Sequence, residues 1–323
     1  MVPLSILDLS PIVEGKDAAD ALRCSLDLAR HAERWGYRRF WVAEHHGMPG
    51  VATAATSVVL AHIAAGTSTI RVGAGGIMLP NHAPLVIAEQ FGTLESLHPG
   101  RIDLGIGRAP GTDPITAQAL RRNLTADVED FPNDVVELLE YFQPPRPGRV
   151  LAVPGAGLNV PVWILGSSLY GAHLAASLGL PFAFASHFAP AQLLRALALY
   201  RAGFRPSAHL QRPYAMVGAT VIAAETDERA AFLATSLEQA VVNLRSGRPG
   251  RLPPPRADLR WGPMERAMLD EFLACSAIGS GETVQRRLAE IAARTEADEL
   301  ILASQIFDHT ARLRSYELVA PQR

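Results

Sequence analysis

The side chains best suited to chemistry in this 323-residue chain follow short apolar segments that are rich in β-branched residues. Three groups of such residues are Glu44-His45-His46, Gly105-Ile106-Gly107-Arg108 and Gly166-Ser167-Ser168, and single histidines occupy comparable positions at His82 and His187. Imidazole groups move protons near neutral pH, whereas hydroxyl and guanidinium groups bind phosphate. The residue types therefore suggest a proton-transfer group and an anion-binding group.

Gly166-Ser167-Ser168 has the most direct mechanistic interpretation. It follows an apolar segment and precedes a stretch of helical periodicity that ends at Gly179. The free N–H groups and the dipole at a helix N-terminus favour an anion, and the two hydroxyls add donors. Arg108, expected on the neighbouring strand, would add bidentate hydrogen bonds to a phosphate. The alternatives are that Ser168 only caps the helix and that Arg108 forms a salt bridge at the rim.

The histidines leave more alternatives open. Adjacent residues on a strand point to opposite faces, so only one of His45 and His46 is expected to enter the site. A metal site is not predicted, because the last predicted strand ends in Ser304-Gln305 rather than in a carboxylate ligand. His45 is then either a structural residue or a group that acts in acid–base chemistry or at the edge of a cofactor. For His82 and His187, structural and functional roles both stay open.

The elements that must position these groups form a regular series. Amphipathic stretches separate eight candidate strands, and the first such stretch begins after Asp17 and ends at Gly36. The candidate strands span residues 4–9, 40–43, 70–74, 101–106, 162–165, 182–185, 216–223 and 299–303. Their starts are spaced by roughly 30–35 residues where nothing is inserted, which is typical of βα units.

We therefore predict one (β/α)8 TIM-barrel domain over residues 1–323, with an open doubly wound sheet as the alternative. Insertions are expected after strand four, at about 107–161, and after strand seven, at about 245–280. In such a barrel the chemistry lies at the carboxyl ends of the strands. The polar groups described above all follow predicted strands, so they are expected to share that face.

The composition excludes several classes of protein. Hydrophobic residues make up 48% of the chain and the formal net charge is −2, which indicates a large core and no general attraction to nucleic acid or an anionic membrane. Cys24 and Cys275 cannot form a disulfide framework, and the first residues lack a signal-peptide pattern, so we expect a cytoplasmic protein. The glycines at 105–111 have the wrong spacing for a dinucleotide fingerprint, so no separate nicotinamide domain is predicted.

Taken together in chain order, these motifs resemble a known family. The matching segments are 43–46, 73–80, 100–108, 161–181 and 281–318. In this order they are similar to the bacterial luciferase-like flavin monooxygenases, and the resemblance spans nearly the whole chain. It implies a (β/α)8 barrel, a homodimer or larger assembly, and FMN or deazaflavin F420 at the barrel mouth.

The resemblance also implies roles for individual residues. Arg108, Ser167 and Ser168 would bind the FMN phosphate, with Gly171 in the first helical turn. Light-emitting luciferase has an acidic residue beside its phosphate-binding serine, whereas Ser167 stands here. No luciferase-type aldehyde pocket is evident, so light emission is not implied.

For the reacting part of the cofactor, the resemblance implies a non-proline cis peptide between Gly75 and Gly76 beneath the flavin ring and makes His45 the catalytic residue. The expected activity is an FMN-dependent monooxygenation of a small organic molecule with O2, with a separate flavin reductase and with segment 245–280 as a lid. The alternatives are an F420-dependent dehydrogenase or reductase and a non-catalytic flavin-binding protein.

Overall fold

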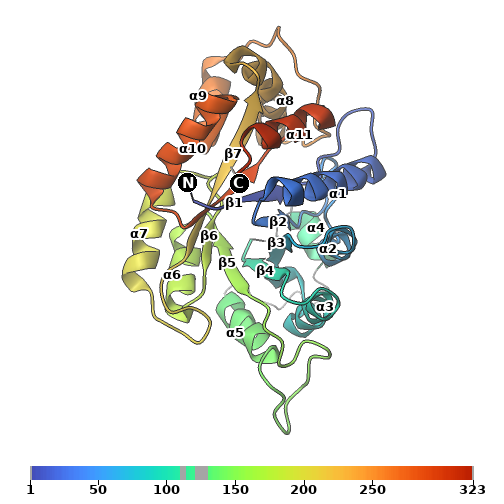
Figure 1. The fold of residues 1–323 in the computed structure, drawn as a ribbon, viewed down its shortest axis with the longest axis vertical. Coiled ribbons are helices and arrows are strands. Elements are labelled where there is room, and N and C mark those ends of the chain that lie inside the picture. The colour runs from blue at the N-terminus through green and yellow to red at the C-terminus, as the bar shows by residue number, and fades with distance from the viewer. Residues whose placement is uncertain (1, 110–113, 121–129, 322–323) are drawn as a thin grey trace.

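A closed barrel of parallel strands forms the centre of the protein (Figure 1). The computed structural model describes residues 2–109, 114–120 and 130–321. The barrel runs in the order β1-β2-β3-β4-β5-β6-β7-β9 and closes by pairing β9 with β1. Its strands are β1 (Leu4–Asp8), β2 (Arg39–Val42), β3 (Arg71–Met78), β4 (Ile102–Gly107), β5 (Val162–Gly166), β6 (Phe182–Phe184), β7 (Ala215–Ala224) and β9 (Glu299–Ala303). The predicted TIM barrel and its eight strands are therefore confirmed.

Helices surround the barrel on its outer side (Figure 1). They are α1 (Ala18–Trp35), α2 (Thr56–Ala65), α3 (Pro84–Leu97), α4 (Pro114–Leu120), α5 (Phe131–Tyr141), α6 (Leu169–Leu178), α7 (Leu193–Gly203), α8 (Asp227–Arg245), α9 (Pro263–Phe272), α10 (Gly281–Thr295) and α11 (His309–Leu318), with short 3-10 turns at η1 (Leu79–Asn81) and η3 (Leu273–Cys275). Among the described helices, none combines the length and apolar character that a membrane crossing requires.

Local signals define the ends of α1 as predicted. The Asp17 carboxylate accepts a hydrogen bond from the Asp20 amide, and the Asp20 carboxylate accepts one from the Asp17 amide, which makes a capping box. At the other end Gly36 adopts the left-handed conformation, with φ of 82°, which glycine tolerates without steric cost. This helix therefore needs no distant contact to set its limits.

A ninth strand was not predicted. β8 (Ser276–Ser280) lies in the second insertion and pairs with Thr220–Ala224, the distal half of β7. The proximal half of β7, Met216–Thr220, pairs with β9 instead and so belongs to the barrel. The segment Ser276–Ser280 is short and has only Ala277 and Ile278 as apolar residues, so its sequence carries a weak strand signal.

The amino end of the barrel is closed by a buried ionic network. The Arg39 guanidinium donates to Asp103 at 2.8 Å and to Glu299 at 2.9 Å. Trp41 Nε1 donates to Asp103 at 3.2 Å, and the Tyr214 hydroxyl donates to Glu299 at 2.8 Å. These buried charged groups are paired with one another, so they close the amino end of the barrel. The candidate site lies at the opposite end, where the strands have their carboxyl ends.

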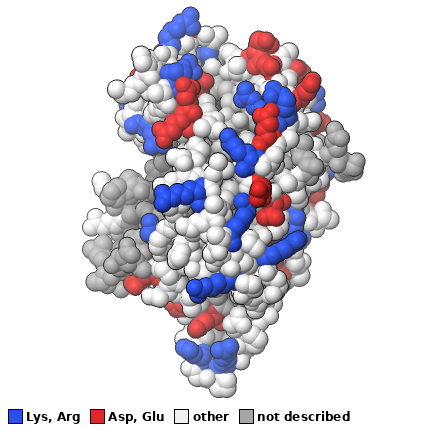
Figure 2. All heavy atoms as spheres, turned by 90° about the vertical axis from the view of Figure 1, so that its left-hand side faces the viewer, with Lys and Arg blue, Asp and Glu red and all other residues white. Residues whose placement is uncertain are grey.

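Charge on the outer surface is mixed. Figure 2 shows Lys and Arg side chains separated by uncharged surface and by acidic side chains on one face of the molecule. A duplex-binding protein usually carries a continuous basic field. The face that Figure 2 shows therefore gives no support to nucleic-acid binding.

Candidate active site

Glu44 is the centre of a buried polar cluster at the carboxyl end of β2. Its Oε1 accepts hydrogen bonds from Nε2 of His46 at 2.7 Å and from Nε2 of His82 at 2.9 Å. Its Oε2 accepts from the Met78 amide at 3.1 Å. Burial by itself would raise the pKa of Glu44, but these hydrogen bonds outweigh burial and lower it. Glu44 therefore stays ionised and ties the end of β2 to the end of β3.

These three side chains are also the group best placed for a metal ion among the described residues. Each of Glu44, His46 and His82 offers one ligand atom, and those atoms lie within 4.8 Å of one another. However, Oε1 of Glu44 already accepts a hydrogen bond from each imidazole. These two hydrogen bonds connect the loop after β2 to the loop after β3.

His45 and His46 lie in the loop after β2, which ends at Val42, and their side chains have different environments. His46 bonds to Glu44, whereas Nδ1 of His45 is buried and has no hydrogen-bond partner in the described part of the chain. Burial lowers the pKa of His45, and the Glu44 charge opposes that effect only in part. His45 is therefore neutral at neutral pH, with a ring nitrogen free for a ligand.

The peptide bond between Gly75 and Gly76 is cis, as predicted. The backbone here is closely surrounded, because a Cβ atom on Gly76 would lie 2.7 Å from the carbonyl oxygen of Gly105. A Cβ atom on Gly75 would lie 2.7 Å from a Leu7 methyl group and 3.1 Å from the Trp41 ring. Leu7 and Trp41 belong to the interior cluster of the barrel, so this peptide lies directly on the packed interior.

The predicted phosphate-binding residues come together at the start of α6. The Arg108 guanidinium, from the end of β4, lies 4.1 Å from the centroid of the Tyr170 ring in the first turn of α6. Ser168 is the N-cap residue of α6, but its side chain makes no capping hydrogen bond. A Cβ atom on Gly171 would lie 3.4 Å from Cα of Gly166, so glycine lets the first turn of α6 lie against the end of β5.

This geometry suits a phosphate group. A guanidinium, a free serine hydroxyl and the N–H groups of a helix N-terminus are donors that phosphate prefers. The alternative that Ser168 serves only as a side-chain cap is not supported, since that hydrogen bond is missing. Arg108 stacks on an aromatic ring and forms no salt bridge with another residue of the described ranges, so the alternative of a rim salt bridge gains no support there.

The remaining predicted histidines also lie at the barrel mouth. His82 binds Glu44, so its role is to fix the loop after β3. His187 follows β6, and its Nδ1 is buried without a hydrogen-bond partner in the described ranges. Cys275 is buried and Cys24 partly buried, and both are free thiols whose pKa is raised by burial. Neither cysteine is a reactive thiolate.

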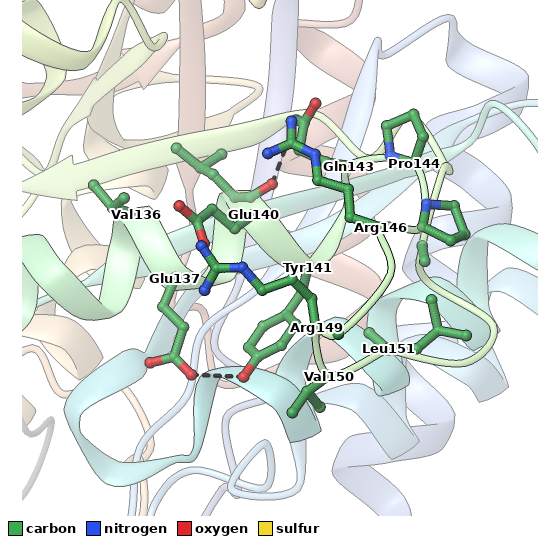
Figure 3. A pocket seen from close by; sticks show the side chains of 15 residues that line it. Val136, Glu137, Glu140, Tyr141, Gln143, Pro144, Arg146, Arg149, Val150 and Leu151 are labelled. Carbon is green, nitrogen blue, oxygen red and sulfur yellow. Dashed lines mark hydrogen bonds between the residues drawn. The ribbon is translucent and has the colours of Figure 1, made fainter.

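A separate hollow of about 610 Å³ lies outside the barrel, between α5 and the loop that follows it. Figure 3 shows Glu137 and Tyr141 of α5 and Arg146, Arg149 and Val150 of the loop among the residues that line it. None of the predicted site residues lines it. This hollow is therefore distinct from the candidate active site.

Known proteins share this architecture over nearly the full length of the chain. The profile of a family described as luciferase-like monooxygenase matches residues 4–299. The chain belongs to the luciferase-like monooxygenase family. The resemblance inferred from the motifs is thereby confirmed, and the protein is an enzyme of the monooxygenase class to which the named members belong.

Individual members of the luciferase-like monooxygenase family show how close the relationship is. A luciferase-like monooxygenase of Escherichia coli (strain K12) is 55% identical over 320 residues, which cover 98% of this chain and 96% of the relative. The N-acetyl-S-alkylcysteine monooxygenase of Bacillus subtilis (strain 168) is 38% identical over 255 residues, or 77% of this chain and 75% of the relative. The solved structure of apo-MsnO8 is 36% identical, covers 99% of this chain and 98% of its own, and superimposes with a TM-score of 0.90.

Sequence reasoning missed two residues that build the site. Glu44 was noted only as part of a motif, yet its carboxylate organises His46 and His82. Gly218 was not noted, although its missing side chain makes room for the ring of His187. A carboxylate next to paired histidines was an available signal for Glu44, whereas an isolated glycine within an apolar strand carries little information about its neighbours.

Proposed function

We propose that this enzyme is an FMN-dependent monooxygenase that uses reduced FMN and O2 to oxygenate a small organic molecule. The observation that carries the proposal is the pairing of Arg108 with the first turn of α6, beside the uncommitted hydroxyl of Ser168. Ser167 and Gly171 belong to the same cradle. These donors fit the phosphate of FMN, and they lie at the barrel mouth that also carries His45.

Each residue has a distinct task in this proposal. Bound reduced FMN supplies electrons to O2 and so makes oxygen transfer possible. Arg108, Ser167 and Ser168 hold the phosphate, and the Gly75–Gly76 backbone lets a flat ring approach because it lacks side chains. His45 accepts or donates a proton at its free Nδ1. The Glu44 cluster fixes the backbone on both sides of His45, so the imidazole keeps its place.

The substrate proposal is limited to its class. A relative that is 38% identical is named for N-acetyl-S-alkylcysteines, which are organic sulfides. We therefore propose a small organic substrate and use N-acetyl-S-methylcysteine as the first compound to test. A separate flavin reductase and a homodimer complete the proposed system.

The test begins with the cofactor. We expect the purified protein to bind FMN, with the cofactor identified by absorbance and mass. Reduced FMN supplied under 18O2 should transfer one labelled oxygen atom to a product. Reduction of a substrate with F420 and no O2 consumption would favour the F420-dependent alternative. A third outcome would favour a non-catalytic flavin-binding protein. In that case the protein would bind FMN, but it would not speed the reaction of reduced FMN with O2, and no compound in a panel of organic molecules would gain labelled oxygen.

A further inference from the structure

The loop between α5 and β5 forms an arm, residues 143–153, that projects from the body of the molecule (Figure 1). A hydrogen bond closes the root of the arm, because the Gly157 amide donates to the Phe142 carbonyl oxygen at 3.0 Å. The root also packs closely on α3, since a Cβ atom on Gly92 would lie 2.3 Å from Cα of Gly155. The position of the arm is therefore set by packing at its base.

The arm combines a stiff backbone with exposed apolar side chains. Prolines occur at positions 144, 145 and 147, and proline fixes φ and favours an extended chain. Val150, Leu151 and Val153 are 64%, 47% and 64% exposed. Exposure of apolar surface to water is unfavourable, and a concentration of it on a folded protein is typical of a contact with another molecule.

The arm stands away from α5 of its own chain and leaves the hollow of about 610 Å³ between the two (Figure 3). Val136 and Leu139 of α5 and Val150 and Leu151 of the arm contribute apolar side chains to its lining. The packed root holds the arm in this position and so keeps the hollow open. A segment of another molecule that entered the hollow would bury apolar surface of α5 and of the arm together.

The charged residues around the hollow are divided between its two elements. Glu137 and Glu140 belong to α5, whereas Arg146 and Arg149 belong to the arm, which has no acidic residue. Neither arginine forms a salt bridge within the part of the chain that the structure describes. The arm is therefore positively charged, and the arm of another molecule with the same charges would be attracted to the acidic residues of α5.

A second copy of the chain meets both requirements. In an isologous contact the same surface lies on both sides of a two-fold axis, so each element of one copy meets the complementary element of the other. The basic, apolar arm of each copy would then lie beside the acidic α5 of its partner. One symmetric contact fills both hollows and covers both arms.

We propose that two copies of the chain exchange their arms, so that each arm lies in the hollow of the other copy and this face forms a two-fold dimer interface. The inference rests on the proposed function only for its homodimer, and it names the surface that forms it. The arm leads into the amino end of β5 at Val162, whereas His45 and Arg108 follow the carboxyl ends of β2 and β4. The interface is therefore separate from the candidate active site, and FMN binding should not depend on it.

Sedimentation velocity at several protein concentrations measures the dimer directly. We expect the wild-type protein to sediment with the mass of two chains. Leu151→Asp should raise the Kd of the dimer more than about 100-fold, because a symmetric contact would bury the new carboxylate twice. Leu244→Asp is the matched control, because Leu244 is 46% exposed on α8 and does not line the hollow. Circular dichroism checks that both variants are folded.

Charge reversal tests whether the contact joins two chains. One variant carries Arg146→Glu and Arg149→Glu on the arm, and a second carries Glu137→Arg and Glu140→Arg on α5. Each variant alone places like charges at both contacts, so the Kd of its dimer should rise about 10- to 100-fold. In an equimolar mixture the acidic arm meets the basic helix and the basic arm meets the acidic helix, so a heterodimer should form. Charges that act only within one chain would not give this recovery.

Three results would overturn the proposal. They are a wild-type protein that is monomeric at every concentration, a Leu151→Asp variant that dimerises as well as the control, and a mixture of the charge variants that stays monomeric. The proposed chemistry is judged separately. A monomeric protein that binds FMN and transfers labelled oxygen would overturn the interface alone, whereas a dimer that neither binds FMN nor transfers oxygen would contradict the proposed FMN-dependent activity alone.

Discussion

The guanidinium of Arg108 lies 4.1 Å from the centre of the Tyr170 ring, so a side chain from the end of β4 reaches the first turn of α6. The two residues are far apart in sequence, and the barrel places them next to each other because β4 and β5 are hydrogen-bonded neighbours. An arginine that stacks on an aromatic ring keeps its N–H groups pointing outward in the plane of the guanidinium. Those donors remain available for a phosphate.

The first prediction follows from this contact. Arg108→Ala should weaken FMN binding by about 1.5–3 kcal/mol, the usual range for losing a charged hydrogen-bond donor. Riboflavin binding should change little, since riboflavin has no phosphate. Titration of both ligands against the same protein preparation checks this. Equal losses for FMN and riboflavin would contradict the phosphate assignment.

The second prediction concerns His45. His45→Asn should leave FMN affinity near the wild-type value, because the phosphate cradle lies on β4, β5 and α6. Product formation should fall by about 10²–10⁴-fold and more hydrogen peroxide should be released, because an amide keeps a hydrogen bond but transfers no proton at neutral pH. Product and peroxide are quantified together with reduced FMN and O2. An unchanged product yield would show that His45 has a structural role.

The third prediction concerns the Glu44 cluster and acid stability. Because the pKa of Glu44 is lower in the folded protein than its ordinary value of 4.5, the native state binds fewer protons than the unfolded state. This contribution to stability is present above pH 4.5 and is lost as the pH falls below it.

Glu44→Gln should therefore flatten the dependence of the free energy of unfolding on pH below that value. The variant should also be less stable at pH 7 by about 1–3 kcal/mol, because a neutral amide replaces a buried, hydrogen-bonded carboxylate. Urea unfolding at several pH values measures both effects. If the free energy of unfolding depends on pH in the same way in Glu44→Gln and in the wild type, Glu44 does not contribute to the acid sensitivity of the fold.

The fourth prediction concerns the second insertion as a lid. The Leu252 amide donates to the Ile12 carbonyl oxygen at 2.9 Å, so this segment lies on the loop that follows β1. A Cβ atom at Gly50, in the loop after β2, would lie 2.3 Å from the Gly250 carbonyl oxygen. Gly50→Ala should therefore displace the segment and increase trypsin cleavage at the exposed Arg251.

Bound FMN should slow the same cleavage in the wild-type protein if the segment closes over the site. Limited proteolysis with mass spectrometry, with and without FMN, measures this directly. Complete protection of Arg251 in the flavin-free protein would argue against a lid.

Much of the site was visible in the sequence because barrel chemistry follows strand ends. His45, Arg108 and the two serines all follow apolar segments of the sequence, and in the structure Arg108 lies against the helix that begins after Ser168. The strands themselves were recognisable because both their faces are buried and they are continuously apolar, as in β7. The binding roles of these residues remain predictions.

The tertiary structure decided what depends on neighbours that are distant in the chain. β8 has few apolar residues, and it forms because β7 is long enough to extend past the barrel and offer a free edge. The His187 ring lies next to Gly218, where a side chain would leave no room for it. Glu44 connects two loops because His82, which follows β3, donates a hydrogen bond to it.

Sequence alone determined the features that arise from short-range physics: the capped limits of α1, the alternation of strands and helices, and the family to which the motifs belong. These depend on residues within a few positions of one another, where periodicity, caps and glycine conformations act directly. Only the fold decided which imidazole nitrogens are hydrogen-bonded, because a hydrogen bond such as that between His82 and Glu44 joins residues 38 positions apart. The closed barrel places such partners side by side, and local patterns in the sequence do not predict which residues will meet.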